Sequence, residues 1–304
     1  MLKIANHPIY RYALPEGHRF PMVKYELLPK LLIDQKICTP ENFFKPQRVS
    51  SALILKVHGE SYYNKLVNLS LDKKEIRKIG FPLRQELVDR SHYIIGGTIQ
   101  GCEYAITNGV GMNIAGGTHH AFKDHGEAFC LLNDQGIAAH YLLDSKKASK
   151  ILIIDLDVHQ GNGTAALFQD NPNVFTFSMH GAKNYPFKKQ KSDLDIGLEN
   201  DTQDALYLEI LKNTLPRLLI KVSPDFVFYL SGVDILASDK LGKLGCTLEG
   251  CMQRDHFVFE SCKKANIPVQ VSMGGGYSKD IGVILEAHKN TFKTAQEVFF
   301  NTLF

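Results

Sequence analysis

The sequence predicts an α/β fold in which helices flank one doubly wound, mainly parallel sheet. The first observation is that short apolar runs, polar or glycine-rich turns and helix-compatible stretches alternate along the chain, a pattern typical of βαβ units. The second is that several runs are apolar almost without interruption, as in Ile151–Ile154, which is expected of strands covered on both faces. Hydrophobic residues make up 44% and charged residues 22% of the 304 residues, which excludes wholesale disorder.

The apolar runs and the turn signals place the individual elements. Two amphipathic helices are expected, one over Asn133–Leu143 and one that begins near Thr202 as its N-cap. Pro216 is expected to kink or divide the second helix. No repeat or linker divides the chain, so we expect one domain over residues 1–304. Six strands are expected: Ala52–Val57, Val110–Ala115, Ile151–Leu156, Val174–Met179, Phe226–Leu230 and Val269–Met273.

Charge and cysteine usage limit the classes of partner and compartment. A net charge of +3 gives no support to direct nucleic-acid binding. Six scattered cysteines without a C-x-x-C pair are typical of reduced thiols, not of a disulfide framework. The first eight residues lack the apolar stretch of a signal peptide, and no run approaches 18 apolar residues, so no membrane span is expected. We therefore expect a cytoplasmic protein, and its oligomeric state stays open.

Unusual polar residues follow four of the expected strands. In open α/β sheets, ligands bind outside the carboxyl ends of the strands. We therefore expect these groups to meet at one edge of the sheet. The four segments are Gly116-Gly117-Thr118-His119-His120, Asp155-Leu156-Asp157-Val158-His159, Ser231-Gly232-Val233-Asp234 and Gly274-Gly275-Gly276-Tyr277.

Asp157 and His159 are two residues apart, so their side chains point to the same face of an extended segment. With Asp234 they form a three-ligand set that suits Zn²⁺ and leaves a position open for water. The same ligands could also hold Fe²⁺ or Co²⁺. A lone Asp-x-His pair is more often a solvated strand end, and the other strand-end groups are what favour the metal.

The remaining polar groups fit hydrolysis beside a metal. His119 and His120 could supply a base for water and an acid for the leaving amine, with Asp155 and Asn162 orienting the imidazoles. The Tyr277 hydroxyl could stabilise a developing oxyanion. The alternative is a turn with partly buried imidazoles and a glycine-rich turn beside a packed aromatic ring.

These motifs resemble the zinc-dependent histone deacetylase family, including its bacterial members, from Leu14–Met22 to Gly274–Tyr277. The resemblance implies the arginase/deacetylase fold, one catalytic Zn²⁺ and hydrolysis of an N-acyl-lysine amide. The segment 155–163, in which Gln160 follows the histidine and Asn162 replaces a second aspartate, is most similar to class IV. Class IV resemblance also implies tolerance of acyl groups longer than acetyl.

The resemblance also implies roles for individual residues. Asp157, His159 and Asp234 match the metal ligands, and His120 matches the main general base and acid. His119, paired with Asp155, matches an electrostatic and orienting group. Tyr277 matches the tyrosine that polarises the scissile carbonyl. A structural K⁺ is implied at Asp155 and Ser178, with the backbone carbonyls of Asp157, His159 and Met179.

The substrate tunnel follows from the same resemblance. Phe129 matches a tunnel wall, Ala128 stands where the family has glycine, and Gly275 is expected beside the substrate. Tyr185 is a candidate for the opposite wall. Arg19 matches an arginine near the inner end of the tunnel, or else is a buried arginine paired with the fold.

We expect an enzyme that removes acetyl or longer acyl groups from acyl-lysine side chains of proteins or peptides. One alternative is a hydrolase of acetylpolyamines or other small acylated amines, which Lys188, Lys189 and Lys191 would disfavour near a rim loop. A second alternative is a non-catalytic acyl-lysine binder, and the complete set of ligands, histidines and tyrosine argues against it. No nucleotide-binding glycine motif is present in the sequence.

Overall fold

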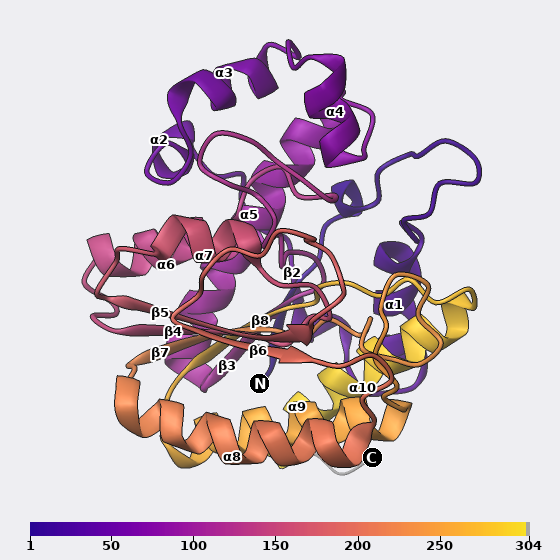
Figure 1. The fold of residues 1–304 in the computed structure, drawn as a ribbon, viewed down its shortest axis with the longest axis vertical. Helices are drawn as coiled ribbons and strands as arrows, with labels where there is room; N and C mark the ends of the chain where they lie inside the picture. Colours follow the sequence, from indigo (N-terminus) through magenta and orange to yellow (C-terminus); the bar gives the residue numbers. More distant parts are fainter. Residues whose placement is uncertain (302–304) are drawn as a thin grey trace.

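Eight strands form a single sheet in which every neighbouring pair is parallel (Figure 1). The order across the sheet is β2-β1-β3-β8-β7-β4-β5-β6. The computed structural model describes residues 1–301. Its strands are β1 (Lys3–Ala5), β2 (Phe43–Phe44), β3 (Val110–Asn113), β4 (Ile151–Asp155), β5 (Val174–Gly181), β6 (Leu194–Leu198), β7 (Phe226–Leu230) and β8 (Val269–Ser272).

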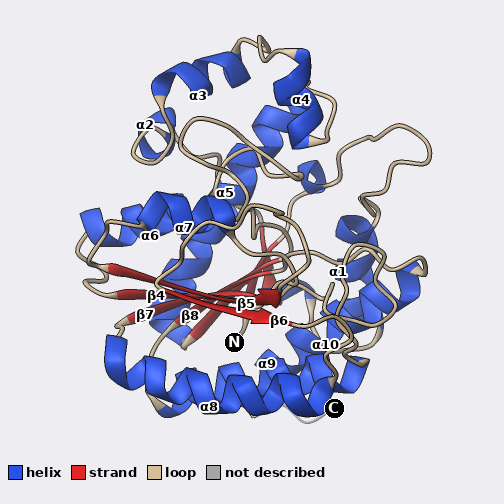
Figure 2. Cartoon of the chain, in the orientation of Figure 1, coloured by secondary structure: helices blue, strands red, loops and turns tan. Residues whose placement is uncertain are grey.

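Helices cover both faces of the sheet (Figure 2). One face carries α5, α6 and α7; the other carries α8 and α9, with α10 packed on α9 and α1 on α10. Three short helices, α2 to α4, form a lobe beyond the α5 layer. None of the helices within residues 1–301 has the length and hydropathy needed to span a bilayer. The helices are α1 (Lys24–Asp34), α2 (Ser51–Ile54), α3 (Glu60–Val67), α4 (Lys73–Ile79), α5 (Gln85–Asn108), α6 (Asp134–Asp144), α7 (Asn162–Phe168), α8 (Asp204–Val222), α9 (Leu248–Lys264) and α10 (Ile281–Phe300).

The central strands form the core, as their uninterrupted apolar sequences predict. Every side chain of Ile151–Ile154 in β4 and of Phe226–Leu230 in β7 is at most 1% exposed. Layers of helix on both sides leave no solvent-facing row in these strands, so they show no polar alternation. The prediction of an α/β fold with a parallel sheet flanked by helices is confirmed.

Five of the six expected strands are present, and the first is wrong. Residues 52–57 lie in α2 and the turn after it. Ile54, Val57 and His58 are the buried residues there, and this spacing of three and four is helical. The sequence pattern did not reveal β1, β2 and β6, because the first two have three and two residues and β6 is a partly exposed edge strand.

The two helix predictions differ in outcome. α6 is confirmed, with the Asn133 side chain as N-cap accepting from the Gly136 N–H at 2.8 Å. α8 begins at Asp204, because the Thr202 hydroxyl donates to a preceding carbonyl and does not cap the helix. Pro216 does not divide α8, which continues to Val222. Burial of the apolar side chains on either side of the proline offsets the roughly 3 kcal/mol that an internal proline costs.

Candidate active site

The four segments with unusual polar residues follow β3, β8, β7 and β4, which are the four adjacent central strands of the sheet. Because all four are parallel, their carboxyl ends lie at one edge, and the segments that follow them converge there. The sequence-based expectation of a single site at this edge therefore matches the topology.

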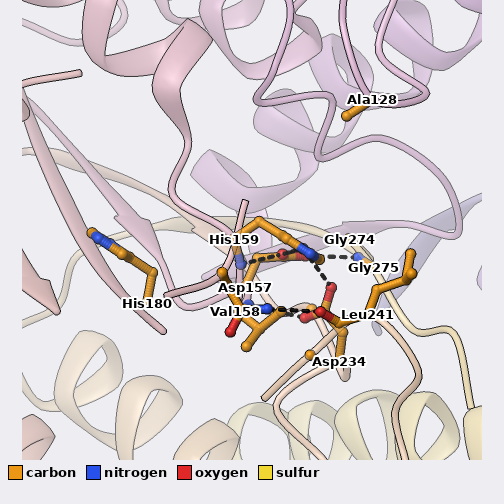
Figure 3. Close-up of polar contacts among 12 residues, drawn as sticks. Ala128, Asp157, Val158, His159, His180, Asp234, Leu241, Gly274 and Gly275 are labelled. Atoms are coloured by element: carbon orange, nitrogen blue, oxygen red, sulfur yellow. Dashed lines mark hydrogen bonds and ion pairs between the residues drawn. The ribbon is translucent and has the colours of Figure 1, made fainter. Parts of the chain in front are cut away.

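Asp157, His159 and Asp234 form the buried centre of this site (Figure 3). The His159 Nδ1 atom lies 3.0 Å from Asp157 Oδ1 and 3.2 Å from Asp234 Oδ2. One ligand atom from each of the three residues lies within 4.8 Å of the others, and all three side chains are buried. This donor set could hold a metal ion.

The electrostatics of the three groups fit a bound cation. Burial, and next the charge of Asp157, raise the pKa of Asp234 to about 7. Burial lowers the pKa of His159, but the adjacent carboxylates of Asp157 and Asp234 outweigh it and raise that pKa to about 10. Apart from its 3.2 Å contact with His159 Nδ1, which does not have hydrogen-bond geometry, the buried Asp234 Oδ2 atom has no polar partner among residues 1–301. A divalent cation would satisfy this oxygen and favour the deprotonated form of each ligand.

Backbone N–H groups fix the two carboxylates. Val158 N donates to Asp234 Oδ1 at 2.9 Å, and Gly275 N donates to Asp157 Oδ2 at 2.9 Å. A Cβ atom on Gly275 would lie 2.1 Å from Asp234 Oδ2. Gly275 therefore lies against the carboxylates of Asp157 and Asp234, which can approach its backbone because it has no side chain. It also lines the inner cavity of the site.

The two histidines have different partners. His119 Nδ1 and Asp155 Oδ2 are 2.7 Å apart, whereas His120 Nδ1 and Asn162 Oδ1 are 2.6 Å apart. Burial lowers the pKa of His119, but the Asp155 carboxylate outweighs it and raises that pKa above its ordinary value. Burial, with the neighbouring charges of His119 and His159, holds the pKa of His120 well below its ordinary value. His120 is therefore the neutral member of the pair, and it lines the cavity.

Tyr277 lies beside the Asp157–His159–Asp234 cluster, with its ring centroid 6.3 Å from that of His159. Its backbone N–H donates to Asp239 Oδ2 at 2.5 Å, and its ring packs on Phe20 and Phe129. Burial, and next the charge of Asp234, raise the pKa of its hydroxyl well above its ordinary value. The hydroxyl therefore stays protonated and can act as a hydrogen-bond donor.

A cavity of about 300 Å³ leads from the surface to His120, His159 and Tyr277. Phe129 and Tyr185 line it, as expected for the tunnel walls. The Tyr185 hydroxyl donates to Glu127 at 2.5 Å, which fixes that wall. Ala128 also lines this cavity and has φ +43, a left-handed conformation that favours glycine.

The expected position of Arg19 is wrong. This side chain is exposed and lies at the outer cavity, with its guanidinium 5.0 Å from the centroid of Phe129. The next residue, Phe20, is buried and lines the inner cavity, whereas Arg19 lines only the outer one. Arg90 of α5 lines the inner cavity instead, donating to the Tyr10 carbonyl at 2.7 Å.

Lys24 is a second basic residue of the interior that the sequence did not reveal. It is fully buried, donates to the Gly274 carbonyl at 3.1 Å and lies 5.9 Å from the Tyr277 ring centroid. Burial lowers its pKa to about 8, although Asp234 and Asp157 oppose this shift. Its position beside the carboxylates offsets part of their negative charge.

Two further groups hold the loops of the site. Asp134 Oδ1 accepts from Thr118 N at 2.8 Å and so fixes the turn before His119. Arg254, which is fully buried, donates to the carbonyls of Gly232 and Leu156. Both residues lie in helices, α6 and α9, where the sequence pattern alone does not distinguish them from solvent-facing charges.

The residues of the expected monovalent-cation site lie on adjacent strands. Asp155 of β4 and Ser178 of β5 are register partners, and both are buried, as is Met179. The Ser178 hydroxyl lies 2.9 Å from His180 Nδ1. His180 itself points away from the Asp157–His159–Asp234 cluster (Figure 3).

The all-parallel sheet and the buried Asp-His-Asp cluster at its carboxyl edge are consistent with the arginase/deacetylase class of α/β proteins. The sequence matches the histone deacetylase domain over residues 18–291. The chain therefore belongs to the histone deacetylase family. Family membership supports a hydrolase of the deacetylase type, which cleaves acetylated amides.

Individual relatives agree with this assignment. An uncharacterized protein of Picosynechococcus sp. is 43% identical over 97% of this chain and 99% of its own length. Histone deacetylase 2 of Arabidopsis thaliana is 30% identical over 90% of this chain and 73% of its own length. The acetoin utilization protein AcuC of Staphylococcus aureus is 27% identical, over 90% of this chain and 76% of that protein.

Proposed function

We propose that this chain is a zinc-dependent deacylase that removes acetyl groups from N-acetyl-lysine side chains of proteins or peptides. The observation that carries this proposal is the convergence of neutral His120, protonated Tyr277 and the Asp157–His159–Asp234 cluster at the inner end of one cavity. His120, whose pKa is lowered, and Tyr277, whose pKa is raised, have the protonation states that amide hydrolysis requires of a base and a hydrogen-bond donor at neutral pH.

Asp157, His159 and Asp234 would hold the zinc ion. When bound, a zinc ion polarises the substrate carbonyl and makes water a better nucleophile at neutral pH. His120 accepts a proton from the attacking water at Nε2, because Nδ1 is held by Asn162. It then gives this proton to the amine nitrogen as the amide bond breaks, so that lysine and a carboxylate are released.

His119 and Tyr277 act on the developing charges. His119, held by Asp155, is positioned beside His120 with ring centroids 4.0 Å apart and contributes electrostatically. The Tyr277 hydroxyl donates to the carbonyl oxygen as that oxygen gains negative charge. A hydroxyl with a pKa far above neutrality remains a donor throughout the reaction.

The inner cavity supports acetyl rather than a long acyl chain. Its volume is about 40 Å³, with Phe20, Tyr25 and Ile94 among its walls. At about 10–15 Å³ for each water molecule, it holds only a few waters. The class IV resemblance predicted longer acyl groups, and the size of this cavity argues against that preference.

Two secondary assignments complete the proposal. Asp155 and Ser178 would hold a structural K⁺, supported by their burial as neighbours across β4 and β5. A cytoplasmic location is supported by six cysteines that are all free and buried.

The test is a panel assay on zinc-reconstituted protein. The substrates are an acetyl-lysine peptide, the same peptide with a long-chain acyl-lysine, and an N-acetylpolyamine. We expect kcat/KM to be highest for the acetyl-lysine peptide, and Asp234→Asn to lose both zinc and turnover. A preference for the acetylpolyamine would make the chain a small-amine hydrolase. Peptide binding without turnover would make it an acyl-lysine binder.

A further inference from the structure

Four basic side chains surround the outer cavity: Arg19, Lys78, Lys183 and Lys243. They come from the segment before α1, the end of α4, and the loops after β5 and β7. All four residues are exposed. Among the described residues that line this cavity, none is acidic. We call these four residues the basic rim.

Carboxylates neutralise only half of the basic rim. Lys78 lies 3.5 Å from Glu127, and Lys183 lies 3.4 Å from Glu199. Glu127 is engaged further, since the Tyr185 hydroxyl and His125 also contact it. Within residues 1–301, neither Arg19 nor Lys243 forms an ion pair.

The two unpaired cations are held at the mouth by other contacts. The Arg19 guanidinium lies over the Phe129 ring, which itself lines the cavity. The Lys243 Nζ atom donates to the Lys183 carbonyl at 3.3 Å, which keeps the two loops together. Lys189 serves a different purpose: its amine donates to the carbonyls of Asn184 and Pro186 and so holds the loop itself.

We propose that the basic rim selects substrates that carry a carboxylate next to the acylated lysine. This inference rests on the proposed function, because it assumes that an acyl-lysine side chain occupies the cavity. With the amide at His120 and Tyr277, the aliphatic chain passes Phe129 and the α-carbon emerges among the rim cations. Acidic side chains of a peptide, or the α-carboxylate of free acyl-lysine, then lie within their field. An acetylpolyamine brings further positive charge to the same place and is disfavoured.

The expected effect is moderate and depends on salt. Charges that line an entrance act mainly on the association rate and on its salt dependence. For exposed side chains we expect about a three- to tenfold advantage in kcat/KM for an acidic over a neutral peptide at low ionic strength. The advantage should largely disappear at 1 M salt, where the Debye length falls to about 3 Å.

The experiment compares blocked acetyl-lysine peptides whose flanking residues are acidic, neutral or basic, using zinc-reconstituted protein. A second pair compares free Nε-acetyl-lysine with its α-methylamide. In the wild type we expect kcat/KM to be highest for the acidic peptide, lower for the neutral one and lowest for the basic one. In the Arg19→Gln/Lys243→Gln variant these differences in kcat/KM should become small. Arg19→Lys/Lys243→Arg keeps both charges and should keep the order. Lys212→Gln, an exposed lysine of α8 outside this cavity, should behave as the wild type.

The outcomes separate this inference from the proposed function. An advantage for the acidic peptide supports a polypeptide source of the carboxylate, and one confined to free acetyl-lysine supports an amino-acid source. The inference would be overturned, with deacylation intact, if kcat/KM in the wild type were equal for the three peptides or highest for the basic one. It would also be overturned if the Arg19→Gln/Lys243→Gln variant kept the wild-type preference for the acidic peptide. If no peptide is hydrolysed, the proposed function fails, and the calorimetric affinities of the three peptides still decide the inference by the same order.

Discussion

Replacing Gly275 by alanine should strongly weaken metal binding at the proposed site while leaving the fold in place. Gly275 lies between Gly274 and Gly276, both of which have positive φ, but its own φ is not in the left-handed region. Alanine can therefore adopt its backbone conformation, and any effect must come from the added methyl group.

The added Cβ atom would lie 2.1 Å from Asp234 Oδ2 and 2.8 Å from Asp157 Oδ2. Since ordinary contacts of a Cβ begin near 3.4 Å, the Asp234 oxygen must move by about 1 Å. Metal–ligand distances in proteins vary by only about 0.2 Å. Changes to groups that merely orient a ligand weaken metal binding by about 10–100-fold. For a displaced ligand we expect at least about 100-fold, or about 2.7 kcal/mol.

The measurement is competition for zinc against a chromophoric chelator, with metal analysis after dialysis. Gly59→Ala is the matched control, because its Cβ would meet only the Lys123 carbonyl oxygen at 3.6 Å. Thermal unfolding of the zinc-free proteins separates loss of the site from loss of the fold. Without a metal the carboxylates are free to move, so we expect the Tm of the zinc-free Gly275→Ala protein to differ from that of the zinc-free wild type by only a few degrees. A zinc Kd within about threefold of the wild type would refute the reasoning, because Asp234 would then not need the space above Gly275.

Three further substitutions test the histidine pair, the tyrosine and the tunnel wall. Asn162→Asp should raise the pKa of His120, because a carboxylate favours the imidazolium form more than an amide does; the acidic limb of kcat/KM against pH should move upward, and an unmoved limb would show that Asn162 does not partner the base. Tyr277→Phe should keep zinc and fold but lower kcat by about 10²–10³-fold, and wild-type turnover would exclude a role for its hydroxyl. Ala128→Gly should raise the free energy of unfolding by up to about 1 kcal/mol. Glycine removes the strain of a left-handed backbone at φ +43, and this gain exceeds the cost of the entropy that glycine adds to the unfolded chain. Ala139→Gly inside α6 should instead cost about 1 kcal/mol, and an equal loss at both positions in a urea titration would contradict the argument.

The sequence was sufficient to predict the convergence of the site because the topology follows from local patterns. Uninterrupted apolar runs such as Ile151–Ile154 indicate strands covered on both faces, and their alternation with helical stretches indicates that the sheet is parallel. Once the sheet is parallel, residues that follow different strands must meet at one edge. Asp157 and Asp234 are 77 residues apart in the chain, yet strand position alone predicts that they approach.

Long-range packing of irregular segments could not be predicted in this way. Arg19 and Lys24 are close in sequence, but the first lies at the surface and the second donates to Gly274 in the interior. No periodicity governs the segment that joins them to the rest of the chain. Arg90 was hidden for a different reason: it belongs to a long helix, α5, in which a single arginine ordinarily faces solvent. The contact of Gly275 with Asp234 could not be predicted either, because Gly275 follows β8 and Asp234 follows β7, and only the structure gives the distance between them.

The histidine pair shows how neighbouring residues of one kind acquire different chemistry. His119 and His120 are consecutive, buried and 4.0 Å apart between ring centroids, so burial alone would lower both pKa values. The difference comes from their partners: Asp155, at the end of β4, is a carboxylate, whereas Asn162, at the start of α7, is an amide. The charge that His119 gains beside Asp155 lowers the pKa of His120 further. In the proposed mechanism the carboxylate therefore does not activate the base directly: it favours the positive charge on His119, and the pKa of His120 stays low, so that His120 would be unprotonated and able to accept a proton from water.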